Sequence, residues 1–94
     1  MKFYKVGFHR NSSRIWLDNE TDLNTAGFNC TKPYKVEYEA GKIVLTIDNE
    51  GNRKVSGKKG KPVIDLCSKK IIGFSDKCKV EYSTNNIIIT NERN

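Results

Sequence analysis

The feature that most constrains the fold of this chain is an internal repeat. The sequence Lys-Val-Glu-Tyr at positions 35–38 recurs at positions 79–82, forty-four residues later. Other segments match in the same order, and the matched pairs are 27–28 with 73–74, 43–46 with 87–90, and, more loosely, 15–17 with 63–66. A series of matches in one order predicts two copies of a single structural unit.

Each copy has the pattern of a strand, one or two helical turns and a closing hairpin. The strands are expected at 14–17 and 63–66, and the helical turns at 18–26 and 67–72. Gly27 and Gly73 then stand where a helix commonly ends in a left-handed residue. Val36, Tyr38, Ile43, Leu45 and Ile47 alternate with mostly polar residues, as half-buried hairpin strands require, and the matched segments 79–82 and 87–90 predict the same hairpin in copy two. An extra strand is expected at Phe3–Phe8.

The length of 94 residues fits one domain. A unit of about 45 residues is too small to bury its own hydrophobic face, but two units in one chain can bury their faces against each other. We therefore expect a mostly β, intramolecular pseudo-dimer. Its parts are repeat one at 3–50, a basic connecting loop at 51–61 and repeat two at 62–94.

The positive charge of the chain is concentrated in one segment. The net charge is +6, from 17 basic and 11 acidic residues, and residues 53–61 read RKVSGKKGK, with five basic residues and no acidic one. A concentrated charge creates a local positive potential that attracts polyanions. Nucleic acid is the most common partner of this kind, and an acidic protein surface is the next.

Other features of the sequence predict a cytoplasmic protein. The first ten residues, MKFYKVGFHR, interrupt every short apolar run with a charge, so we expect no signal peptide. No stretch approaches the length of a membrane span. Cys30, Cys67 and Cys78 are odd in number and widely spaced, which favours reduced thiols.

Several short motifs resemble those of the SymE-type and AbrB/MazE-type swapped-hairpin domains. The motifs are Gly7-Phe8-His9-Arg10, Ile15-Trp16-Leu17, Ala26-Gly27-Phe28, Val36-Glu37 and Gly41-Lys42-Ile43-Val44-Leu45. The resemblance implies that hairpin–helix–hairpin units interleave into a small barrel that binds DNA through one basic face. Lys61-Pro62-Val63-Ile64-Asp65 stands where many AbrB-like regulators carry Gly-Arg-Val-x-x-Pro.

The resemblance also implies which residues meet the partner. It places Arg53, Lys54, Lys58, Lys59 and Lys61 on the basic face, where they would contact phosphates. In the first copy, Arg10, Asn11 and Arg14 are expected to reach phosphates or base edges and to complete one continuous strip. The alternative is that 53–61 is a solvated linker and 9–14 an ordinary polar loop.

Aromatic and titratable residues add little to this prediction. Trp16 and Tyr34 can stack on bases, although a place in the core or at its edge is the favoured interpretation for Trp16 because Ile15 and Leu17 flank it. His9 is the only histidine and the cysteines lack a Cys-x-x-Cys spacing, so we expect no metal, cofactor or enzymatic activity.

The expected function is a small DNA-binding regulator of transcription or of a toxin–antitoxin system, with DNA favoured over RNA. One alternative is a phage or mobile-element protein that inhibits a host defence complex, such as a CRISPR effector, by covering a partner's surface. Another is a targeting module for a nucleic-acid-modifying enzyme. A homodimer is also expected if the end strands Phe3–Phe8 and Ile87–Thr90 are exposed, because exposed edges pair readily.

Overall fold

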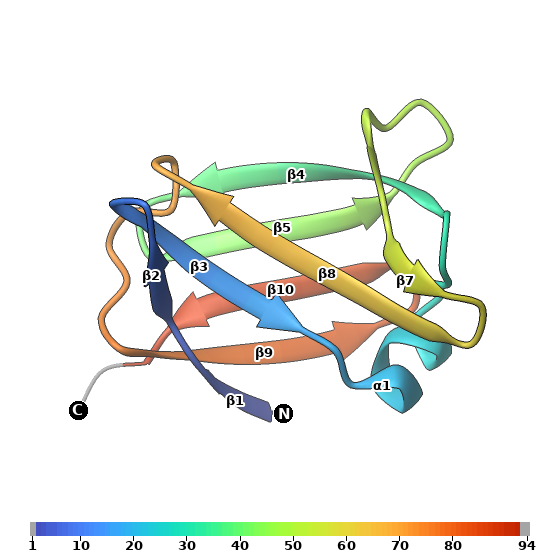
Figure 1. Ribbon diagram of the computed structural model, residues 1–94, viewed down its shortest axis with the longest axis horizontal. Coiled ribbons are helices and arrows are strands. Elements are labelled where there is room, and N and C mark those ends of the chain that lie inside the picture. Colours follow the sequence, from blue (N-terminus) through green and yellow to red (C-terminus); the bar gives the residue numbers. More distant parts are fainter. Residues whose placement is uncertain (1, 93–94) are drawn as a thin grey trace.

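A computed structural model describes residues 2–92, which form ten strands and one short helix (Figure 1). The first half contains β1 (Lys2–Lys5), β2 (Gly7–His9), β3 (Ser12–Leu17), α1 (Glu20–Thr25), β4 (Pro33–Glu39) and β5 (Lys42–Ile47). The second half contains β6 (Arg53–Lys54), β7 (Ser56–Lys58), β8 (Lys61–Ser68), β9 (Lys77–Ser83) and β10 (Asn86–Asn91). The expectation of a mostly β chain is therefore confirmed.

The strands form two antiparallel sheets. The six-stranded sheet has the order β1-β9-β10-β5-β4-β6, and the four-stranded sheet has the order β2-β3-β8-β7. In Figure 1, β3 and β8 run obliquely across the six-stranded sheet. The chain changes from the larger to the smaller sheet at Val6 and again at Val55. Because both sheets keep edge strands, the closed barrel that the resemblance implies is not formed.

The two repeats meet in the centre of each sheet. Along β5 and β10, Ile88 lies opposite Val44, its counterpart in the repeat. In the four-stranded sheet β3 pairs with β8, and Trp16 lies opposite Asp65. The flanking pairs are Ile87 with Leu45, Ile89 with Ile43, Ile15 with Leu66, and Leu17 with Ile64. Each sheet is thus built around an approximate two-fold relation between the copies.

The basic segment expected to be a connecting loop contains strands. β6 pairs with β4, and β7 pairs with β8 in a hairpin closed by Lys59 and Gly60. This hairpin has the same form as the β2–β3 hairpin, because Ser56 lies opposite Val63 as Gly7 lies opposite Arg14. The strands escape recognition in the sequence because Val55 is the only buried residue between 53 and 61.

The second expected helix is absent from residues 2–92. In copy one, the side chain of Asn19 accepts a hydrogen bond from the backbone N–H of Asp22 and caps α1, and Gly27 follows the helix with φ +92°. In copy two, Cys67 and Ser68 extend β8 by pairing with Arg14 and Ser13. Sheet hydrogen bonding therefore overrides the local tendency toward a helical turn.

The ends of the chain also differ from expectation. The strand expected at Phe3–Phe8 is divided at Val6, whose backbone N–H donates to the carbonyl of Asp76. The segment Ile87–Thr90 lies between β5 and β9 in the middle of the larger sheet, so it offers no free edge. The short helix α1 is neither long nor apolar enough to cross a membrane, and residues 2–92 contain no other helix.

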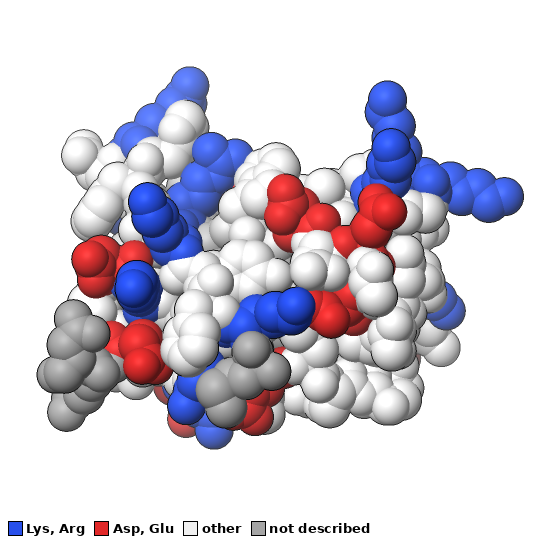
Figure 2. All heavy atoms as spheres, turned by 90° about the horizontal axis from the view of Figure 1, so that it is seen from below, with Lys and Arg blue, Asp and Glu red and all other residues white. Residues whose placement is uncertain are grey.

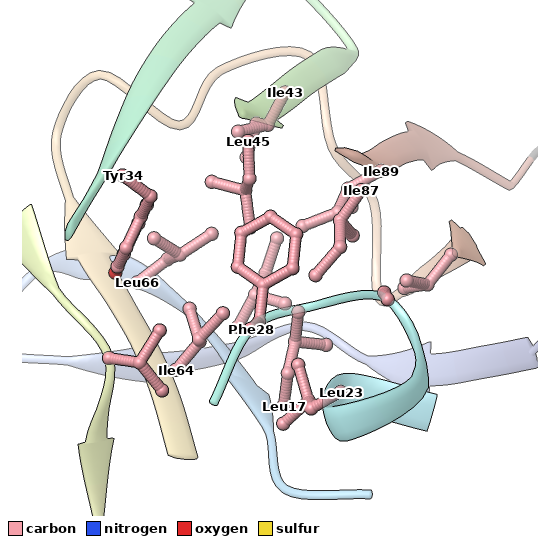
Figure 3. Close-up of a cluster of buried hydrophobic side chains, with 14 of the residues drawn as sticks. Leu17, Leu23, Phe28, Tyr34, Ile43, Leu45, Ile64, Leu66, Ile87 and Ile89 are labelled. Carbon is pink, nitrogen blue, oxygen red and sulfur yellow. The ribbon is translucent and has the colours of Figure 1, made fainter. Parts of the chain in front are cut away.

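The core lies between the sheets and draws on both repeats (Figure 3). The four-stranded sheet contributes Ile15, Leu17, Ile64 and Leu66, and the six-stranded sheet contributes Tyr34, Ile43, Leu45, Cys78, Val80, Ile87 and Ile89. Phe28 fills the space between them, edge-on to Tyr34 with ring centroids 6.0 Å apart. This shared core makes the four-stranded sheet a firm support for the residues on its outer face.

Candidate nucleic-acid interface

The exposed lysines of the basic segment gather at the tip of the β7–β8 hairpin. Lys58 on β7 lies directly opposite Lys61 on β8, and Lys59 occupies the turn between them. Gly60 closes the turn with φ +79°, a conformation that glycine adopts without strain. None of the three lysines forms an ion pair with any residue in the described range 2–92.

Gly57 allows this hairpin to close tightly. Its φ is +100°, and a Cβ atom added there would collide with the carbonyl oxygen of Lys61. The carbonyl of Gly57 also accepts a hydrogen bond from the Cys30 thiol at 3.3 Å, which ties the hairpin to the loop before β4. A side chain at position 57 would not fit, because the backbone of Lys61 lies too close. Glycine therefore lets the hairpin close, and the closed hairpin carries the three lysines at its tip.

The β2–β3 turn is the counterpart of this tip in the first repeat. Arg10 and Asn11 form it with φ values of +52° and +65°, and both are exposed. However, β3 and β8 are antiparallel, so Ser13 pairs with Ser68 and Leu17 with Ile64. The two tips therefore lie at opposite ends of the four-stranded sheet (Figure 1), separated by roughly 25 Å along β8.

The expectation of one continuous basic strip is consequently wrong. Seen from below, Lys and Arg side chains stand in separate groups with Asp and Glu side chains between them (Figure 2). The physical reason is the two-fold relation between the repeats, which sends equivalent hairpins in opposite directions. The structure brings Lys58, Lys59 and Lys61 together and places Arg10 and Asn11 elsewhere.

Arg14 lies between the two tips and is held by an acidic partner. Its Nε donates a hydrogen bond to Oδ1 of Asp65, and its Nη2 donates one to Oδ2. Both donor–acceptor distances are 2.9 Å. The hydrogen bonds to Asp65 raise the pKa of Arg14 above its ordinary value. The guanidinium also lies over the Trp16 ring, 4.9 Å from its centroid. Arg14 therefore orients its neighbours and is not free for a phosphate in this arrangement.

Arg53 is also engaged within the protein. Its Nε donates a hydrogen bond to the hydroxyl of Tyr34, at a distance of 3.3 Å. Its Nη2 donates one to the backbone carbonyl of Asp65, at a distance of 3.1 Å. These contacts link β6 to β4 and β8. The adjacent Lys54 is exposed on the six-stranded sheet, away from the β7–β8 tip. The predicted site residues thus divide into hairpin-tip lysines, fold-stabilising arginines and residues that stand apart.

The two candidate stacking residues have opposite environments. Tyr34 is 2% exposed and belongs to the core, whereas Trp16 is 43% exposed on the outer face of the four-stranded sheet. The structure does not place Trp16 in the core or at its edge, because alternation along β3 turns its side chain to the outer face, away from the buried Ile15 and Leu17. Beside Trp16 is a groove of about 440 Å³ lined by Lys5, Gly7, Arg14 and Trp16.

Burial perturbs titratable side chains away from these surfaces, and these side chains form no metal-binding cluster in residues 2–92. No group of three or more His, Cys, Asp or Glu side chains in residues 2–92 is placed to hold a metal ion. Burial raises the pKa of Cys78 to about 11, so its thiol is protonated at neutral pH. The hydroxyls of Tyr4 and Tyr82 share a hydrogen bond of 2.9 Å, and burial raises the pKa of both.

Comparisons with protein-family models, with curated proteins and with solved structures find no match for this chain. The relationship to swapped-hairpin domains therefore stays a prediction from the sequence. A function for the chain accordingly has to be inferred from the residues themselves.

Proposed function

We propose that this chain binds duplex DNA and that the β7–β8 hairpin is the element that contacts it. The observation that carries the proposal is the pairing of Lys58 with Lys61. Like charges directly opposite each other destabilise an antiparallel pair. No acidic residue in the described part of the chain forms an ion pair with either lysine. A polyanion would relieve the repulsion.

The shape of the hairpin favours DNA over RNA. The major groove of B-DNA admits a two-stranded β-ribbon, and β7 and β8 form such a ribbon with Lys59 at its end. The major groove of A-form RNA is too deep and narrow for side chains to read. The tip of the hairpin would enter the groove, and Lys59 in the turn would contact phosphates together with Lys58 and Lys61 on either side of it. Contacts of this kind position a protein but carry little sequence information.

The interleaving of the two repeats supports a regulatory role within this proposal. Each sheet places strands of the two copies side by side, β5 with β10 and β3 with β8. This arrangement is compatible with a relationship to the AbrB/MazE-type and SymE-type swapped-hairpin domains, whose duplicated unit would here be fused in one chain. We therefore assign the chain to transcriptional or toxin–antitoxin-type regulation as part of the same proposal.

The proposal predicts a defined salt dependence. If three lysines each neutralise one phosphate, the logarithm of the association constant should fall with the logarithm of salt concentration at a slope of about −2.7. A fourfold increase in salt should then weaken duplex binding about fortyfold. Fluorescence anisotropy of a labelled duplex at several salt concentrations measures this slope. A slope near zero, or no binding at low salt, would show that the hairpin does not act in this way.

A second candidate function is a protein-interaction module that inhibits a host defence complex or guides a nucleic-acid-modifying enzyme. The observation that favours it is Phe8, which is 79% exposed on the edge strand β2. A partner held there should survive nuclease treatment during co-purification and be lost in Phe8→Ser, while Phe3→Ser leaves it bound. A partner lost with nuclease would instead be held through nucleic acid.

A further inference from the structure

The groove beside Trp16 exists because a strand ends there. On one side of Trp16, β8 places Asp65 directly opposite. On the other side, β2 pairs with β3 only as far as Gly7 opposite Arg14, and the chain then leaves at Val6 for the six-stranded sheet. Within residues 2–92, no strand residue therefore pairs with Trp16 on that side, and the Trp16 side chain is 43% exposed.

Gly7 leaves the floor of this groove open. It contributes no side chain, and a Cβ atom added there would meet only the carbonyl oxygen of Arg14, at 3.9 Å. Gly7 does not have a positive φ, so its backbone conformation does not require glycine. Because Gly7 has no side chain, the groove between Lys5 and Trp16 stays open.

The indole ring is held in place before any ligand arrives. Arg14 lies over the ring, and its guanidinium is fixed by the two hydrogen bonds to Asp65. A ring that is already oriented loses little conformational entropy when a second ring stacks on it. Arg14 and Asp65 therefore hold the partly exposed indole in one orientation on the outer face of the four-stranded sheet.

Lys5 gives the groove its charge. It lies opposite Lys77 in the pairing of β1 with β9, and it forms no ion pair with residues 2–92. A flat aromatic surface with an uncompensated cation at its margin complements a flat ring that carries an anionic group. A nucleobase with its phosphate has this chemistry, and base stacking on aromatic side chains is a common mode of single-strand binding.

We propose that the groove lined by Lys5, Gly7, Arg14 and Trp16 binds one unpaired nucleobase of a DNA strand. The base stacks on the uncovered part of Trp16, and its phosphate contacts Lys5. A paired base in an intact duplex does not expose its face, so this site discriminates single-stranded from duplex DNA. This inference rests on the proposed function, because it adds a second site of DNA contact to the same chain.

Trp16 is the only tryptophan in the chain, so its fluorescence reports directly on this groove. A short oligothymidylate should quench the fluorescence at low salt, whereas a duplex of equal length should bind without quenching it. Gly7→Val fills the groove and should weaken oligothymidylate binding about tenfold while duplex affinity stays within about twofold. Ser83→Val, at an exposed position on β9 of the six-stranded sheet that lies outside both the β7–β8 hairpin and the groove, is the control and should leave both affinities unchanged.

The inference is overturned if oligothymidylate leaves the fluorescence unchanged or if Gly7→Val is quenched like the wild type. Duplex binding without strand quenching would refute only this inference. Quenching that depends on Gly7, in a protein that does not bind duplex, would refute only the proposed function. Should Gly7→Val lose its folded circular dichroism spectrum, Lys5→Glu provides the same test, because Lys5 is exposed and the change removes a like-charge pair with Lys77.

Discussion

Replacing the three hairpin-tip lysines together, as Lys58→Glu, Lys59→Glu and Lys61→Glu, should weaken duplex DNA binding by about a hundredfold or more at low salt. Three attractive phosphate contacts are lost and three repulsive ones take their place. The salt dependence should change as well, because the slope of about −2.7 that the lysines supply should disappear. Anisotropy titrations of the variant and the wild type with one labelled duplex measure both quantities.

The fold should tolerate this triple substitution. Lys58 and Lys61 already form a like-charge pair across the hairpin, and a pair of glutamates at the same two positions would repel each other at similar cost. The matched control is Lys42→Glu, Lys77→Glu and Lys79→Glu, which makes the same change in net charge on the six-stranded sheet. Equal weakening in the control would mean that total charge, and not the hairpin, governs binding.

The sequence revealed the parts of the fold that carry apolar alternation. The hairpins of β4 with β5 and of β9 with β10 have equivalent registers, with Tyr38 opposite Ile43 and Tyr82 opposite Ile87. β6 and β7 were missed because these two short strands carry no apolar residue. The signal that could have located them is the Lys-Val pair at 5–6 and 54–55, because the chain crosses between the sheets at the valine in both copies.

Long-range pairing limited the prediction of the site. Arg14 reads as a free cation in the sequence, but its partner Asp65 is 51 positions away and becomes a neighbour only when β3 pairs with β8. Arg53 similarly meets the hydroxyl of Tyr34 through tertiary structure. The exposure of Lys58, Lys59 and Lys61 was easier to predict, because side chains beside a tight turn are exposed without any long-range contact.

Trp16 shows a different limit, because the necessary signal was present. A residue between Ile15 and Leu17 points away from them if the segment is a strand, so the strand prediction itself implied an outward Trp16. Hydrophobicity alone favoured burial. Lys5 and Gly7 were missed as lining residues because the groove forms where β2 leaves β3, a feature that no local pattern shows.

The structure predicts that two phenylalanines at equivalent positions of the repeats contribute unequally to stability. Gly27-Phe28 and Gly73-Phe74 are equivalent in sequence, but Phe28 is fully buried whereas Phe74 is only partly buried against the core. Phe28→Ala should lower the free energy of unfolding by roughly 3–5 kcal/mol, because it leaves a cavity between the sheets and removes the edge-on contact with Tyr34. Phe74→Ala should cost about 1–2 kcal/mol.

Urea denaturation followed by far-ultraviolet circular dichroism measures this difference, with an unchanged m-value showing that the unfolding transition itself is preserved. Small domains have limited stability, so Phe28→Ala is expected to be substantially unfolded even without denaturant. Phe28→Leu retains most of the volume, should cost about 1.5 kcal/mol or less, and keeps the comparison measurable. Equal losses for Phe28→Ala and Phe74→Ala would contradict the asymmetric core, because two equivalent aromatic residues would then fill equivalent spaces between the sheets.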